Sequence, residues 1–144
     1  MSPILFASAI ASGKPIKVFN HGKMMRDFTY IDDIVGGIRM VLFQPAQPNP
    51  DWDASHPSNV SSKAPYRIYN IGNSSPIELM YFIETLEITM GKKAIKEFLP
   101  LQPGDVLKTF ADVSALEKNF QFHPLTSVDE GVKLFVEWYR NYYN

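Results

Sequence analysis

One short segment carries side chains well suited to binding an anion, residues 26–33, with the sequence RDFTYIDD. Met24, Met25 and Phe28 lie near Arg26 in the sequence, which predicts a largely apolar surrounding in which the guanidinium needs hydrogen-bond acceptors. A phosphate or a carboxylate suits its planar fork. The alternative is an internal ion pair with Asp27 or Asp32, which the spacing alone favours because buried arginines commonly pair with carboxylates.

Two other turns carry side chains that suit a polar ligand. In residues 102–105, QPGD, proline followed by glycine predicts a type II-like turn that presents the Asp105 carboxylate. Carboxylates are good acceptors for a pair of hydroxyl groups, although an ordinary loop with a helix-capping aspartate has the same residues. Residues 70–75, NIGNSS, end a strand and begin a helix, which is a place for an anion. An ordinary strand-to-helix connection is the favoured interpretation there.

The patterns of other catalytic and metal sites are missing. His21, His56 and His123 are too far apart for a metal-ligand spacing, and the sequence has no cysteine. No G-x-S-x-G, P-loop or G-x-G-x-x-G pattern occurs. The sequence therefore predicts no metal site, no disulfide, no nucleophile–base pair and no dinucleotide-binding loop.

The composition favours one folded domain and argues against two classes of partner. The chain has 144 residues, of which 45% are hydrophobic and 13% aromatic, so a core is expected. A net charge of −1 does not favour binding to nucleic acid or to an anionic membrane surface. No apolar run approaches the roughly 20 residues that span a bilayer, and the lack of cysteine fits a cytoplasmic protein.

Hydrophobic spacing and turn residues predict an α+β fold with short strands and about five helices. The expected helices are Ser2 to Gly13, 31–43, 76–90 behind a capping box at 75–78, 112–119, and a last helix capped by Thr126 or Ser127. The expected strands are 16–19 and 24–29, paired as a hairpin, together with 66–72 and 94–99. Proline-rich residues 45–65 are expected to form a surface loop.

Two of these helices carry more specific predictions. In residues 31–43 the helical spacing places four apolar residues on one face: Ile34, Ile38, Val41 and Leu42. Gly36-Gly37 in the same helix indicates close approach of another backbone, because glycine there lowers helix stability. The last helix carries an aromatic stripe that is interpreted as core rather than as a stacking platform for nucleic acid: Phe135, Trp138, Tyr139, Tyr142 and Tyr143.

In their order along the chain, these motifs resemble the C-terminal part of the bacterial UDP-glucuronate 4-epimerases. These enzymes are a branch of the extended short-chain dehydrogenase/reductases, within the NAD-dependent epimerase/dehydratase family. The matching segments span essentially the whole chain: 13–16, 18–22, 26–33, 69–74, 101–106, 111–112, 131–132 and 135–139. The resemblance implies that residues 1–144 form the small substrate-binding C-terminal domain of such an enzyme, without its Rossmann half.

The resemblance also implies roles for five residues. Arg26 would contact the pyrophosphate of a UDP-sugar, and Asp105 would bind the ribose hydroxyls. Phe19, with the backbone around Lys17, would lie against the uracil. Gln102 stands where the related UDP-galactose epimerases carry a second phosphate-binding arginine. This departure fits the glucuronate branch, and it makes Gln102 the weaker anion ligand.

The implied parent enzyme is an isomerase that interconverts UDP-glucuronate and UDP-galacturonate with tightly held NAD and a Y-x-x-x-K pair. Neither the pair nor the NAD loop is present here, and Tyr30 is followed four positions later by Ile34. The expectation is a UDP-holding portion that binds no NAD itself and is inactive alone. The alternative expectation is a protein-interaction module that self-associates through exposed faces, without ligand affinity.

Overall fold

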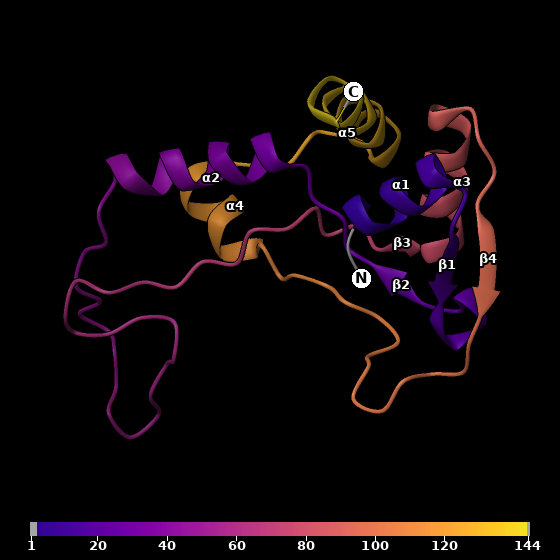
Figure 1. The fold of residues 1–144 in the computed structure, drawn as a ribbon. Helices are drawn as coiled ribbons and strands as arrows, with labels where there is room; N and C mark the ends of the chain where they lie inside the picture. Colours follow the sequence, from indigo (N-terminus) through magenta and orange to yellow (C-terminus); the bar gives the residue numbers. More distant parts are fainter. Residues whose placement is uncertain (1–2, 144) are drawn as a thin grey trace.

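The computed structural model describes residues 3–143. In chain order its elements are α1 (Pro3–Ser12), β1 (Pro15–Val18), the 3-10 turn η1 (Phe19–Gly22), β2 (Met25–Arg26), α2 (Ile31–Phe43), β3 (Ile77–Glu78), α3 (Leu79–Met90), β4 (Ile95–Phe98), α4 (Ser114–Phe120) and α5 (Val128–Tyr143). Figure 1 shows α1, α3, β1 and β4 gathered together, while α2 and α4 lie to one side. The prediction of five α-helices with short strands is confirmed for these residues, and the predicted Ser2 cap lies outside them.

The strands pair differently from the prediction. β1 runs parallel to β4, and β2 pairs antiparallel with β3. The predicted hairpin between residues 16–19 and 24–29 is therefore wrong, although the turn itself forms, with Asn20 and His21 at φ values of 49° and 51°. After the turn, Met25 donates its N–H to the carbonyl oxygen of Leu107 at 2.8 Å. Distant segments therefore pair with the backbone groups that the two strands of a hairpin would have offered to each other. A local turn signal does not reveal such long-range pairing.

Two other local predictions are also wrong. The capping box predicted to open a helix at Pro76 does not form, because Ile77–Glu78 pair with β2 and α3 begins only at Leu79. Residues 66–72 form no strand, but a single bridge joins Arg67 to Ser61. The left-handed stop at Gly91 (φ 67°) and the strand near residues 94–99 are confirmed.

The hydrophobic core lies between α1, α3, α5 and β1. Its buried members are Phe6, Ile10, Ile16, Val18, Met24, Leu79, Phe82, Ile83, Leu86, Val132 and Val136. At the edge of this core the Glu87 carboxylate is only 2% exposed. It accepts hydrogen bonds from Lys96, from Lys93 at 3.0 Å and from the N–H of Ala94 at 2.9 Å. Burial opposes ionisation of Glu87, but these bonds outweigh it and the pKa lies below its ordinary value.

Helix α2 packs through a narrower face than predicted. Only Gly37 is buried in it, and Ile38 and Leu42, on the predicted apolar face, are 53% and 71% exposed. A Cβ at Gly37 would lie 3.2 Å from side-chain atoms of both Ile71 and Phe122. The close approach inferred from the glycine pair therefore exists, but side chains make it and no backbone does.

Helix α5 begins behind the predicted cap, since Ser127 Oγ accepts the N–H of Glu130 at 3.2 Å. Its aromatic stripe is not core as predicted. Phe135 is half-buried, but Trp138 and Tyr142 are exposed, with ring centroids 5.4 Å apart. Within residues 3–143 no helix combines the length and the apolar character that crossing a membrane requires.

Candidate functional site

A cavity of about 730 Å³ opens between α1, β1, the turn after β1, β2 and the 102–109 segment. All five residues singled out in the sequence line it: Lys17, Phe19, Arg26, Gln102 and Asp105. They come from three separate segments, so their meeting is a product of the fold. An opening of this size is ordinary for a small-molecule site.

Lys17 and Phe19 reach the cavity because of how β1 ends. Side chains alternate along β1, so the neighbours of Lys17 on both sides are buried while Lys17 itself stays exposed. The chain then turns through Asn20 and His21, and Asn20 Nδ2 donates to the carbonyl oxygen of Lys23 at 2.7 Å. This turn leaves Phe19 half-buried at the edge of the core, where it forms part of the cavity wall.

Arg26 is half-buried on β2 and makes no ion pair with any carboxylate of residues 3–143. Its Nη1 donates to the carbonyl oxygens of Met25 at 2.8 Å and Leu107 at 3.4 Å. The internal pair with Asp27 or Asp32, the alternative drawn from spacing, is therefore not formed. The guanidinium keeps donors for an incoming anion, and the cavity lies beside it.

Asp27 also lines the cavity, but its carboxylate is occupied elsewhere. It accepts the backbone N–H groups of Ser74 at 3.1 Å, Ser75 at 3.3 Å and Ala111 at 3.4 Å. Its own N–H donates to Thr109 Oγ1 at 3.2 Å. One residue next to Arg26 thus joins β2 to two distant loops.

The turn predicted at residues 102–105 is confirmed. The N–H of Asp105 donates to the carbonyl oxygen of Gln102 at 3.1 Å, and Gly104 has a φ of 84°. A type II turn requires positive φ at its third position, which glycine adopts without a steric penalty. Gln102 and Asp105 are both exposed at the mouth of the cavity, so their polar ends are available to a ligand.

Tyr30 belongs to a different environment. It lines a separate apolar cavity of about 210 Å³ between the start of α2 and α5. Burial raises the pKa of Tyr30, and the nearby Asp32 carboxylate raises it further. A raised pKa keeps the phenol protonated at neutral pH, so Tyr30 is not prepared to act as a base.

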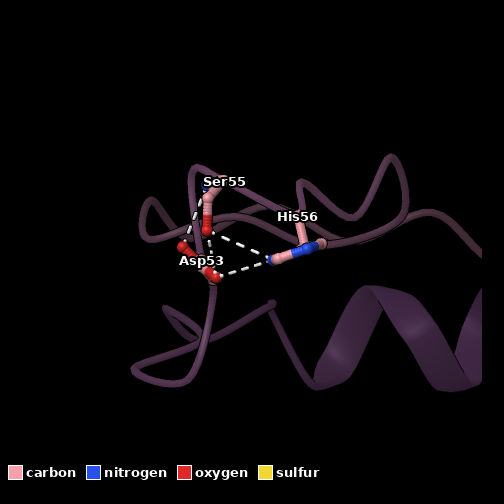
Figure 2. Close-up of polar contacts among 3 residues, drawn as sticks. All are labelled: Asp53, Ser55 and His56. Carbon is pink, nitrogen blue, oxygen red and sulfur yellow. Dashed lines mark hydrogen bonds and ion pairs between the residues drawn. The ribbon is translucent and has the colours of Figure 1, made fainter.

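Figure 2 shows another polar cluster, Asp53, Ser55 and His56, in the long loop after α2. His56 Nδ1 lies 3.2 Å from both Ser55 Oγ and Asp53 Oδ2. A Ser-His-Asp relay needs one ring nitrogen for each partner, whereas a single nitrogen faces both here. Hydrogen bonds from Ser55, and then from His56, hold the pKa of Asp53 below its usual value. The cluster stabilises an exposed turn and does not form a nucleophile–base pair.

The other charged surfaces of residues 3–143 are less suited to binding a ligand than the cavity beside Arg26. A groove of about 580 Å³ between α3 and α5 carries both signs of charge. In it Arg140 donates to the carbonyl oxygen of Thr89 at 3.1 Å, and Asp129 accepts from Tyr81 at 2.9 Å. Within residues 3–143 no group of three or more acidic or histidine side chains is arranged to hold a metal ion.

Sequence reasoning missed part of the cavity lining. Three residues of α1 form an apolar wall, although their spacing had predicted only a helix: Leu5, Phe6 and Ala9. Thr109 was missed as well, because nothing near it in the sequence suggests a site. Asp27 was considered only as a partner for Arg26, and its position in the RDF motif was the one signal for a role of its own.

Comparison with known proteins gives matches along the whole chain. Residues 3–72 match the model of the NAD dependent epimerase/dehydratase family. Protein CapI of Staphylococcus aureus is 48% identical over 99% of this chain and 43% of its own length. A probable UDP-glucuronate 4-epimerase of Rhizobium meliloti is 44% identical over 99% of this chain and 42% of its own length.

The fold is similar to that of a solved enzyme. The crystal structure of UDP-glucuronic acid 4-epimerase from Bacillus cereus, in complex with UDP-glucuronic acid and NAD, superposes with a TM-score of 0.75 at 27% identity. The match covers 96% of this chain and 39% of that one. The chain therefore spans less than half the length of the relatives that it matches.

Proposed function

We propose that the chain belongs to the NAD dependent epimerase/dehydratase family, whose model matches residues 3–72, and that it is the substrate-binding C-terminal portion of a nucleotide-sugar 4-epimerase. In this proposal residues 1–144 hold the UDP end of UDP-glucuronate or UDP-galacturonate, which the complete enzyme interconverts. The similarity to a probable UDP-glucuronate 4-epimerase supports this choice of sugar. We place the protein in the cytoplasm, in keeping with its lack of cysteine.

The observation that carries this proposal is the state of Arg26 in the 730 Å³ cavity. A half-buried guanidinium without an ion-pair partner among the described residues is an anion site ready for use. Asp27, the nearest carboxylate in sequence, is engaged by three backbone N–H groups. A pyrophosphate is therefore the partner that best completes the hydrogen bonding of Arg26.

The other cavity residues suit the rest of a UDP group. Asp105, exposed beside the turn, accepts hydroxyl donors such as those of a ribose. Phe19 and the strand backbone at Lys17 offer a flat apolar wall and peptide groups for the uracil. Gln102 adds a neutral hydrogen bond. Binding energy gained at the nucleotide end positions the sugar carbon that reacts elsewhere in the enzyme.

The described residues fit substrate holding and do not fit NAD. A dinucleotide fingerprint requires a strand that passes through a glycine-rich turn into a helix. In residues 3–143, β1 leads into a short 3-10 turn, β4 leads into a loop, and β3 continues into α3 without a glycine. We therefore assign NAD, together with its tyrosine and lysine, to the part of the enzyme outside these residues, and expect no turnover from this chain alone.

The test is calorimetric titration of the chain with UDP, with NAD as the comparison ligand. Arg26→Ala is expected to weaken UDP binding at least tenfold, since charge-assisted hydrogen bonds contribute about 1.5–3 kcal/mol. Arg39→Ala removes the same charge from the exposed side of α2 and should leave UDP affinity unchanged. Equal UDP binding by the wild type and Arg26→Ala would show that the site is assigned wrongly.

A specific observation favours a second candidate function, self-association. Along α2 four residues follow each other at helical spacing and are each more than half exposed, which we call the outer face of α2: Ile31, Val35, Ile38 and Leu42. In the view of Figure 1, α4 lies beneath α2 and no helix or strand covers it from above. A continuous exposed apolar stripe marks a protein contact, and a second copy of the chain offers a matching surface.

Sedimentation at increasing concentration tests this candidate. The wild type is expected to associate, the Ile38→Glu/Leu42→Glu variant to stay monomeric, and UDP to leave the association unchanged. Ile88→Glu is the control, because Ile88 is exposed on α3, away from the outer face of α2. A monomeric wild type at high concentration would count against self-association without affecting the UDP proposal.

A further inference from the structure

The carboxylate of Asp27 forms hydrogen bonds that connect the segments of the proposed UDP site. Asp27 follows β2, which supplies Arg26, and it accepts the N–H groups of Ser74, Ser75 and Ala111 at 3.1–3.4 Å. Ionised carboxylates form stronger hydrogen bonds than neutral acceptors. Asp27 therefore holds two loops against the strand that presents Arg26.

The loop after Asp105 follows the same strand. Met25 donates to the carbonyl oxygen of Leu107 at 2.8 Å, and the N–H of Thr109 donates back to Met25 at 3.3 Å. Thr109 Oγ1 accepts the N–H of Asp27 at 3.2 Å. These bonds begin two residues after Asp105, so the position of Asp105 depends on how this loop is held.

The segment around Gly72 approaches Ala111 and Asp27 unusually closely. A Cβ added to Gly72 would lie 2.5 Å from Ala111 Cβ and 3.0 Å from Asp27 Oδ2. Ser74 Oγ also donates to the carbonyl oxygen of Ala111 at 2.7 Å. The two loops and the Asp27 carboxylate thus form one packed junction, and a glycine is needed where they meet.

We infer that Asp27 is a positioning residue of the UDP site: its carboxylate, through the N–H of Ala111, and its own N–H, through Thr109 Oγ1, fix the 105–111 loop against β2, so that Asp105 and Arg26 engage one ligand together. The inference rests on the proposed function. None of the three groups that donate to the carboxylate belongs to α1, α3, α5 or β1, which form the core. Loss of the carboxylate should therefore disturb the site more than the fold.

Asp33 provides a matched control within the same chain. Its carboxylate accepts the N–H groups of Leu125 at 3.4 Å and Thr126 at 3.3 Å, which is the same kind of tie between distant segments. Asp33 does not line the cavity. Asp27→Asn and Asp33→Asn each replace a carboxylate with an amide of the same shape, whose NH₂ group cannot accept these bonds.

The experiment is UDP titration of the 144-residue chain and its variants. Asp27→Asn is expected to raise the Kd for UDP about tenfold, the loss of roughly one charge-assisted contact. Asp33→Asn should stay within about twofold of the wild type. If Asp27→Asn binds UDP as well as Asp33→Asn does, the inference is overturned.

A double-variant cycle separates positioning from general destabilisation. If Asp27 acts through the 105–111 loop, adding Asp27→Asn to Asp105→Ala should change the Kd by less than about twofold, because the contact that Asp27 positions is already gone. A purely structural role would instead multiply the two separate effects. Such multiplication would contradict the inference even if each single variant weakens binding.

Thr109 keeps the test usable if Asp27→Asn does not fold. Thr109→Val removes the acceptor of the Asp27 N–H and should weaken UDP binding severalfold, while Thr109→Ser keeps the hydroxyl and should restore it. Equal affinities for these two variants would overturn the inference. If the wild type itself binds no UDP, the proposed function fails and the inference falls with it. If Arg26→Ala loses UDP but neither Asp27 nor Thr109 matters, only the inference fails.

Discussion

Helices α2 and α3 are similar in length and apolar content, and they differ in what covers them. In α3 the side chains of Leu79, Ile83 and Leu86 are fully buried between α1, α5 and β1. In α2 only Gly37 is buried, and Leu42 is largely exposed. Figure 1 shows the same contrast, with α3 inside the group of core elements and α2 beside it.

This difference shows that apolar spacing predicts a helix but not the extent of its burial. The hydrophobic effect rewards any cover that removes apolar surface from water, and the sequence does not state where that cover lies. For α3 it lies within the described residues. For the outer face of α2, the second candidate function places it in a second copy of the chain.

The largest expected difference between the two helices comes from the same substitution, leucine to alanine, made in each of them. Leu86→Ala is expected to lower the free energy of unfolding by about 3–4 kcal/mol, because it leaves a cavity in the core. Leu42→Ala should lower it by less than about 0.5 kcal/mol, since that side chain contacts mostly water. Urea denaturation of the monomer measures both values, and similar losses would show that α2 is buried in solution.

The next largest difference is expected when one carboxylate is removed from each helix. Glu87→Gln is expected to lower the free energy of unfolding by about 3 kcal/mol, because Lys96 loses its buried partner. Asp33→Asn, on α2, should lower it by about 1 kcal/mol, since it weakens two longer bonds to backbone N–H groups. Denaturation at neutral pH measures both, and a larger loss for Asp33→Asn would reverse the ranking of the two regions.

The pH dependence of Glu87 provides an independent check. Its folded-state pKa lies below the ordinary value of 4.5, so the folded state favours the ionised form. Its contribution to stability is therefore complete above about pH 5 and is lost as the pH falls through the folded-state pKa. The stability difference between the wild type and Glu87→Gln should shrink below about pH 4.5. A difference that stays constant down to pH 3 would contradict the ion-pair assignment.

The smallest expected effect concerns the glycines of α2. Gly36→Ala should raise the free energy of unfolding by up to about 1 kcal/mol, because alanine favours the helix and the new Cβ only touches Phe122 at 3.4 Å. Gly37→Ala should gain less, since its Cβ would press at 3.2 Å on both Ile71 and Phe122. A larger gain at Gly37 would mean that α2 is packed more loosely than its neighbours indicate.

Local signals predicted helices better than strand partners. The spacing in residues 31–43 and the glycine at position 91 depend on interactions within a few residues, and both predictions are confirmed. The prediction of a hairpin between residues 16–19 and 24–29 was wrong, because β4 and the 107–109 segment pair with the same backbone groups. Strand pairing depends on all segments that reach an edge, and most of these are distant in the sequence.

The candidate site divides in the same way. Arg26, Phe19 and Asp105 were found as residue types in recurrent motifs, and the cavity that they share follows from the fold. The roles of Asp27 and Gly72 were not predicted, because their partners at residues 109–111 are far away in the chain. A motif identifies a side chain of interest, but the hydrogen-bond partners of that side chain depend on which distant segments pass close to it.

The sequence alone determined the helices and several turns, and it identified Arg26 and Asp105 as side chains that suit an anion and a pair of hydroxyl groups, because these depend on local spacing and on side-chain chemistry. The tertiary structure decided that the Arg26 guanidinium has no ion-pair partner among residues 3–143 and that the Asp27 carboxylate holds two loops. It also decided that α3 is covered and α2 is not. These outcomes depend on contacts between residues that are distant in the chain, and such contacts exist only once the whole chain has folded.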